Sequence, residues 1–143
     1  MEIREIMTRN VEVVNPNASL QTAAQKMKDL DVGSLPVCDG ERLLGMITDR
    51  DITIRATAEG TSPTNTTVGH IMSSGITYCF EDQLVNEAAQ VMEEKQIRRL
   101  PILNRQKKLV GIVSLGDVAV DGGDQMVAGE AITQISRPAR PER

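Results

Sequence analysis

The sequence is poor in aromatic side chains. Tyr78 and Phe80 are the only two, and there is no tryptophan. Because proteins that bind single-stranded nucleic acid stack its bases on aromatic rings, this scarcity argues against that class. A net charge of −4 and an isoelectric point near 5.0 argue against a protein that binds a phosphate backbone. We therefore expect no nucleic-acid partner, and any bound base must be held by aliphatic side chains.

Catalytic and metal-binding groups are also sparse. His70 is the only histidine, and the two cysteines, Cys38 and Cys79, form no CxxC pair. The chain has no zinc-ligand spacing and none of the common glycine-rich phosphate loops or nucleophile motifs. Without a nucleophile beside a base, the sequence disfavours an enzyme, and we expect no metal and no required cofactor. Two isolated cysteines are typical of inert, buried thiols in a reducing compartment.

Long apolar runs are missing as well. No segment approaches the roughly 20 consecutive apolar residues that a membrane-spanning helix needs. Residues 1–5 do not have the pattern of a signal peptide. We therefore expect a cytoplasmic protein with no membrane partner. Its 143 residues, 40% of them hydrophobic and 25% charged, suffice for one compact domain or two small repeats.

What the sequence does contain is an internal duplication. Three short segments recur 65 positions later: Ile6-Met7 as Ile71-Met72, Ala23-Ala24 as Ala88-Ala89, and Leu35-Pro36 as Leu100-Pro101. Gly45 and Asp51 recur 66 positions later as Gly111 and Asp117. A register held over such a length indicates a repeat architecture. We predict repeat one over residues 3–60, a polar linker over 61–67, repeat two over 68–122 and a C-terminal extension over 123–143.

Each repeat has the pattern strand, helix, strand, strand, helix. In repeat one we predict a strand over 11–14, an amphipathic helix from Asn17 or Ser19 to about 30, strands over 35–38 and 43–47, and a helix from Asp51 to about 58. The Asp39-Gly40 pair is typical of a tight hairpin turn between the two later strands.

Repeat two follows the same order. We predict a strand over 76–80, a helix over 85–92, a hairpin of strands 101–103 and 109–113, and a helix from Asp117 that ends at Gly122-Gly123. A further small helix is expected over 127–135, and residues 137–143 are expected to fray. The fold class is α+β (mixed α/β). Because one repeat is too small to bury its own core, we expect the two β-α-β-β-α repeats to pack about a pseudo-twofold axis, with a pair of equivalent clefts.

A hydroxyl-x-x-Asp motif follows the last strand of each repeat. The two copies are Thr48-Asp49-Arg50-Asp51 and Ser114-Leu115-Gly116-Asp117. A hydroxyl residue three positions before an acid is typical of a helix start, where unpaired N–H groups also attract phosphates. Two interpretations stay open: the motifs only cap helices, or they also bind an anion. Arg98-Arg99 likewise form either a solvated helix end or a phosphate contact.

Together these motifs carry a family resemblance. The duplicated pattern, with a hydroxyl-x-x-Asp motif after each Gly-containing strand and a Leu-Pro pair before it, resembles a tandem pair of cystathionine-β-synthase (CBS) domains, also called a Bateman module. The resemblance covers residues 3–122, and Thr48–Ile52 is similar to small stand-alone Bacillus-type CBS-pair proteins.

The resemblance implies a regulatory module rather than an enzyme. Such modules bind adenosine-containing ligands, here AMP, ADP or ATP before S-adenosylmethionine or NAD, in two clefts between the repeats. They form homodimers through their helices, and with no enzyme attached the output would pass to a separate, unknown protein partner. The alternative is a ligand-free structural or protein-interaction module whose motif residues are only helix caps.

The resemblance also assigns residues to the two clefts. In the family the motif aspartate holds the ribose hydroxyls, and the Thr or Ser contacts phosphate. The first cleft would be formed by Met46, Thr48, Arg50, Asp51, Ser73, Thr77, Ile97, Arg98 and Arg99. The second would be formed by Thr8, Glu12, Val32, Gly33, Ser34, Ile112, Ser114, Gly116 and Asp117. We expect the first to be the better phosphate site, because three arginines would face one ligand there.

Overall fold

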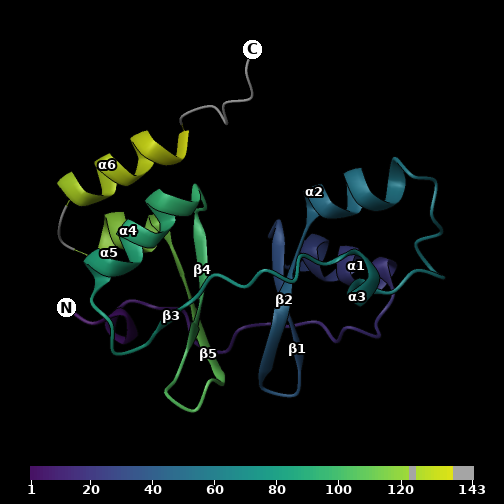
Figure 1. Ribbon diagram of the computed structural model, residues 1–143, viewed down its shortest axis with the longest axis horizontal. Coiled ribbons are helices and arrows are strands. Elements are labelled where there is room, and N and C mark those ends of the chain that lie inside the picture. The colour runs from purple at the N-terminus through teal and green to yellow at the C-terminus, as the bar shows by residue number, and fades with distance from the viewer. Residues whose placement is uncertain (123–124, 137–143) are drawn as a thin grey trace. The chain divides into compact units, whose positions relative to one another are not determined.

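The structure is a computed structural model that describes residues 1–122 and 125–136, with the backbone alone for 125–128. Residue 123, at the predicted helix stop, and the predicted frayed tail over 137–143 lie outside the described residues. The chain forms two compact units (Figure 1). We call Glu12–Ile76 the central unit, and Met1–Val11 together with the chain from Thr77 onward the terminal unit.

The central unit is built on a two-stranded antiparallel hairpin. Its elements are α1 (Leu20–Leu30), β1 (Ser34–Asp39), β2 (Arg42–Thr48), α2 (Asp49–Asp51), the π-helix η2 (Ile52–Thr57) and α3 (Val68–Ile71). The predicted hairpin turn is confirmed: Asp39 pairs with Arg42, and Gly40 has a φ of 63°, which suits glycine. The predicted start of α1 is confirmed too, because the Ser19 hydroxyl accepts a hydrogen bond from the Thr22 N–H at 3.1 Å.

Two predictions for the central unit are wrong. Residues 11–14 form no strand, since Val14 makes only an isolated bridge to Val37. The second helix begins at Asp49 rather than Asp51, directly after its cap at Thr48, and continues as a π-helix from Ile52. Leu20, Ala23 and Met27 of the apolar face of α1 nevertheless pack into one core, whereas Ala24 and Leu30 of that face are exposed. That core comprises Val14, Leu20, Ala23, Met27, Leu35, Val37, Ile47, Ala56, Val68 and Ile71.

The terminal unit is built on a three-stranded sheet in the order β3-β4-β5. Its elements are the 3₁₀ turn η1 (Ile3–Glu5), β3 (Cys79–Phe80), α4 (Val85–Lys95), β4 (Arg99–Leu103), β5 (Leu109–Ser114), α5 (Leu115–Asp121) and α6 (Gln125–Ser136). The predicted β4–β5 hairpin and the predicted extra helix over 127–135 are confirmed. The predicted strand over 76–80 is only the two-residue β3. In Figure 1, α6 lies along α4 and α5.

The compact units do not follow the boundaries of the sequence repeats. The Ile3 N–H donates to the Gln83 carbonyl at 2.8 Å, and Thr8 bridges to Ile112, so the first eleven residues belong with repeat two. In the central unit Met46 bridges to Ser73 in the same way. Each repeat therefore gives its opening segment to the unit that holds the other repeat. No helix within the described residues is long and apolar enough to cross a membrane.

Candidate ligand-binding site

Both hydroxyl-x-x-Asp motifs form reciprocal caps. The Ser114 hydroxyl accepts a hydrogen bond from the Asp117 N–H at 3.0 Å, and Asp117 Oδ2 accepts one from the Ser114 N–H at 2.8 Å. Thr48 and Asp51 repeat this geometry, with both distances 3.0 Å. Each aspartate uses Oδ2 for the cap, and in the part of the chain that the structure describes no hydrogen bond reaches the Oδ1 atom of Asp117. The cap therefore leaves one carboxylate oxygen for a ligand.

Arg98 and Arg99 lie beside the second motif. In the antiparallel pair of β4 and β5, Arg99 is directly opposite Ser114. The Leu115 N–H donates to the Arg98 carbonyl at 2.8 Å, which fixes the start of α5 against this strand. Both arginines are exposed, and among the described residues neither has an acidic partner. Their guanidinium groups are thus available to a ligand.

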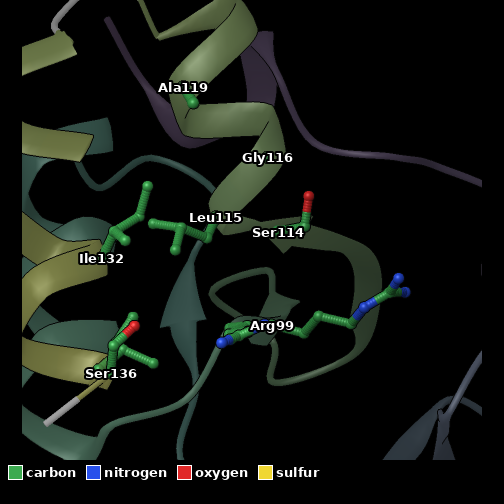
Figure 2. Close-up of a pocket in the computed structure, with 9 residues that line it drawn as sticks. Arg99, Ser114, Leu115, Gly116, Ala119, Ile132 and Ser136 are labelled. Atoms are coloured by element: carbon green, nitrogen blue, oxygen red, sulfur yellow. The ribbon is translucent and has the colours of Figure 1, made fainter. Parts of the chain in front are cut away.

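A groove of about 490 Å³ opens at this point of the terminal unit. Figure 2 shows Ser114 and Gly116 at the start of α5 on one side and Ile132 and Ser136 of α6 on the other. The lining residues are Arg98, Arg99, Ser114, Leu115, Gly116, Ala119, Ile132, Ile135 and Ser136. This volume falls in the range of small-molecule sites. In a chain of net charge −4, the described residues that line the groove include two arginines and no acid.

The corresponding place in the central unit lacks the two arginines and gains a carboxylate. Gly33 and Ser34 stand where repeat two has the arginines, and Ser34 pairs with Thr48. The Asp49 N–H donates to the Gly33 carbonyl at 2.9 Å, and a Cβ placed on Gly33 would lie only 3.0 Å from Asp49 Oδ2. Asp49 therefore puts a carboxylate beside this motif. Arg50 is exposed on the same short helix.

The structure brings the predicted site residues together in two groups. The central unit holds Glu12, Val32, Gly33, Ser34, Met46, Thr48, Arg50, Asp51 and Ser73. The terminal unit holds Thr8, Thr77, Ile97, Arg98, Arg99, Ile112, Ser114, Gly116 and Asp117. Each predicted cleft draws on both groups, and that assignment stays a prediction. Within the central unit, Glu12 is already engaged, since its carboxylate lies 3.7 Å from Lys26 Nζ.

Sequence reasoning missed the helix side of the groove. Leu115, Ala119, Ile132, Ile135 and Ser136 were not among the predicted site residues. It also missed that Arg99 lies next to Ser114, although the predicted hairpin carried that information. Extending the hairpin pairing beyond Pro101 brings Arg99 to within one residue of Ser114, and the β-bulge between Ile102 and Leu103 sets the final register.

The two cysteines are structural. Cys38 and Cys79 are buried free thiols, as predicted, and burial raises the pKa of each to about 11. Such thiols are almost entirely protonated at neutral pH and are therefore poor nucleophiles. Among the described residues, no group of three or more His, Cys, Asp or Glu side chains is placed to hold a metal ion.

Comparison with known proteins decides the family. The CBS domain model matches residues 3–56 and 68–120. The chain belongs to the CBS-domain family. It is 43% identical over 134 residues to the CBS domain-containing protein YhcV of Bacillus subtilis, covering 94% of each chain. The expected mixed α/β fold and the tandem CBS resemblance are thus confirmed.

Two solved CBS structures support the same conclusion. The crystal structure of Hypoxic Response Protein I with two coordinated zinc ions matches with a TM-score of 0.79 and 40% identity, over 85% of this chain and 98% of that one. The CBS domain pair of protein MJ0100, in complex with 5′-methylthioadenosine and S-adenosyl-L-methionine, matches with a TM-score of 0.75 and 26% identity, over 86% of this chain and 100% of that one. CBS pairs are generally regulatory modules rather than catalysts.

Proposed function

We propose that this CBS pair is a non-enzymatic cytoplasmic sensor of an adenine nucleotide, AMP, ADP or ATP, that signals to a separate protein partner. The observation that carries the proposal is the groove in which Arg98 and Arg99 lie beside Ser114, with no acid among its described lining residues. Guanidinium groups pair with phosphate oxygens through two parallel hydrogen bonds, and a serine hydroxyl adds a donor. The adenosine ligands of the MJ0100 pair support an adenosine-containing occupant.

Asp117 does not line the groove itself, but it follows the lining residue Gly116 and would supply the ribose contact. Its Oδ2 atom holds the cap on Ser114, and Oδ1 would accept hydrogen bonds from a ribose diol. In the Thr48–Asp51 motif, the carboxylate of Asp49 beside Gly33 would repel phosphates. We therefore expect the motif at Ser114–Asp117 to take the more highly charged ligand. This reverses the preference drawn from sequence, which had combined both arginines with Arg50.

A thermal-shift screen tests the proposal. AMP, ADP, ATP, S-adenosylmethionine and NAD are each added to the full chain, with adenosine as the phosphate-free control. A ligand that binds only the folded state stabilises it by RT ln(1 + [L]/Kd), about 2.7 kcal/mol at a hundredfold excess over Kd. For a chain of this size we expect the melting temperature to rise by about 5–10 °C. If none of the five ligands raises it, the proposed function is wrong.

Asp117→Asn is expected to weaken nucleotide binding while keeping the helix cap. Asparagine retains a side-chain oxygen that can accept from the Ser114 N–H, so the free energy of unfolding should change by less than about 1 kcal/mol. Loss of a charged acceptor for the ribose diol should weaken nucleotide binding by about tenfold, measured by calorimetry. Asp121→Asn, at the exposed end of the same helix, is the matched control and should bind like the wild type.

The alternative is a ligand-free interaction module in which the motifs only cap helices. One observation favours it: both capping boxes are complete without a ligand. In that case Asp117→Asn, which keeps the cap, leaves nucleotide binding, if any, at the wild-type level. The same variant therefore decides between the two functions.

We also propose a homodimer formed through the helices of the central unit. Leu30 of α1 and Ile54 of η2 are 44% and 50% exposed. The small Ala88-Ala89 pair of α4 cannot serve such a contact, because it is buried in the core of the terminal unit. Light scattering at micromolar concentration should give about twice the chain mass of 15.6 kDa. Ile54→Lys should give a monomer, because it places a charge on the proposed contact surface. The control Val120→Lys, at a more exposed site on α5, should remain a dimer. A monomeric wild type would contradict the proposal.

A further inference from the structure

Helix α6 lies outside the residues that the CBS model matches, which end at 120, yet it forms one wall of the groove. It is held on the terminal unit by Ala131, which is fully buried, and by Ile135, which packs against the core. The Gln96 side chain also donates a hydrogen bond to the Gln134 carbonyl at 3.0 Å. The position of α6 over the groove is therefore set by packing on α4 and α5.

Ile132 differs from these anchoring residues. It lines the groove but remains 47% exposed, so its apolar surface faces the opening rather than the core. Figure 2 shows Ile132 next to Leu115, while the Arg99 side chain extends away from α6. The groove thus has a cationic side at the arginines and an apolar side at Ile132, Leu115 and Ala119.

We infer that α6 forms the wall against which the nucleoside part of the ligand packs, with Ile132 as a specificity residue. This inference rests on the proposed function. It assigns the phosphates of the ligand to the cationic side of the groove and the nucleoside to the apolar side. The arginines would take the phosphates, and the aliphatic wall would take the base, because no aromatic residue lines the groove. An occupant with an anionic end and a flat apolar body fits both sides; a bare polyphosphate fits only one.

The test compares ATP with inorganic tripolyphosphate, which carries similar charge without a nucleoside. Calorimetry on the wild type should show ATP binding more tightly than tripolyphosphate. Ile132→Ala should weaken ATP binding about five- to tenfold, because part of the apolar contact is lost, and leave tripolyphosphate within about twofold. Ile132→Leu should restore ATP binding. Val120→Ala, a truncation at an exposed apolar site that does not line the groove, should change neither ligand.

Amide hydrogen exchange gives a second measurement on the same samples. ATP should slow exchange in α6, and tripolyphosphate should not. If Ile132→Ala binds ATP like the wild type, the role of α6 is wrong while the proposed function stands. If the wild type binds ATP no more tightly than tripolyphosphate, the nucleoside wall is likewise wrong. If neither ligand binds the wild type, this inference is wrong, whereas the proposed function is wrong only if AMP and ADP do not bind either.

Discussion

Replacing Arg98 and Arg99 together with glutamate is expected to lower ATP affinity by at least about a hundredfold. A hydrogen bond to a charged group contributes about 1.5–3 kcal/mol, and the double variant removes two such donors. It also places one carboxylate opposite Ser114 and a second beside it at the start of α5, where the ligand's phosphates would lie. Since both arginines are exposed and have no acidic partner among the described residues, folding should be little affected. Calorimetry measures the affinity, and a melting curve confirms that the variant is folded.

The matched control is the double variant Arg4→Glu with Arg9→Glu. It changes the net charge by the same amount and lies in the same unit, but neither residue lines the groove. Its ATP affinity should fall only slightly, and by less at high salt, because long-range charge effects are screened. An equal loss in both double variants would mean that overall charge, not the groove, governs binding. Unchanged binding in the Arg98 and Arg99 variant would show that the phosphates are held elsewhere.

Gly45→Ala is expected to destabilise the protein by about 3 kcal/mol or more. Gly45 is buried in β2, and a Cβ there would overlap the carbonyl oxygen of Ser73. This segment cannot easily move, because Ser73 and Met46 exchange two backbone hydrogen bonds of 3.0 and 3.2 Å. The methyl group must therefore displace the backbone and break at least one of these bonds. Urea unfolding should show a markedly lower midpoint than the wild type.

Alanine substitutions at two other glycines serve as controls for this result. A Cβ on Gly111 would lie 2.6 Å from Met7 Sδ and 3.0 Å from the Thr8 carbonyl oxygen. Because the methionine side chain can rotate away, Gly111→Ala should be less destabilising than Gly45→Ala. Gly75 is exposed and nothing lies within 4 Å of its added Cβ, so Gly75→Ala should be neutral or slightly stabilising. If Gly45→Ala unfolds at the same urea concentration as Gly75→Ala, the close backbone approach does not constrain β2.

The sequence by itself determined the features that depend on neighbours along the chain. The Asp39-Gly40 turn, the Ser19 cap and the two capping boxes each arise from residues at most three positions apart, and all of them form. The duplication could also be recognised from the sequence, because finding a repeat requires only the order of the residues. These features established the CBS fold and drew attention to the residues around both aspartates.

Features that depend on distant residues were decided by the tertiary structure alone. Residues 11–14 have a strand-like composition but form only one bridge, because a strand requires a partner edge that its own sequence cannot specify. The exchange of opening segments between the units rests on the pairing of Thr8 with Ile112 and of Met46 with Ser73. The charge of the candidate site followed from the strand register that sets Arg99 opposite Ser114. Helix α6 was predicted from its sequence pattern. Its position beside the groove depends on packing against α4 and α5, and a local sequence pattern cannot encode a contact with these earlier helices.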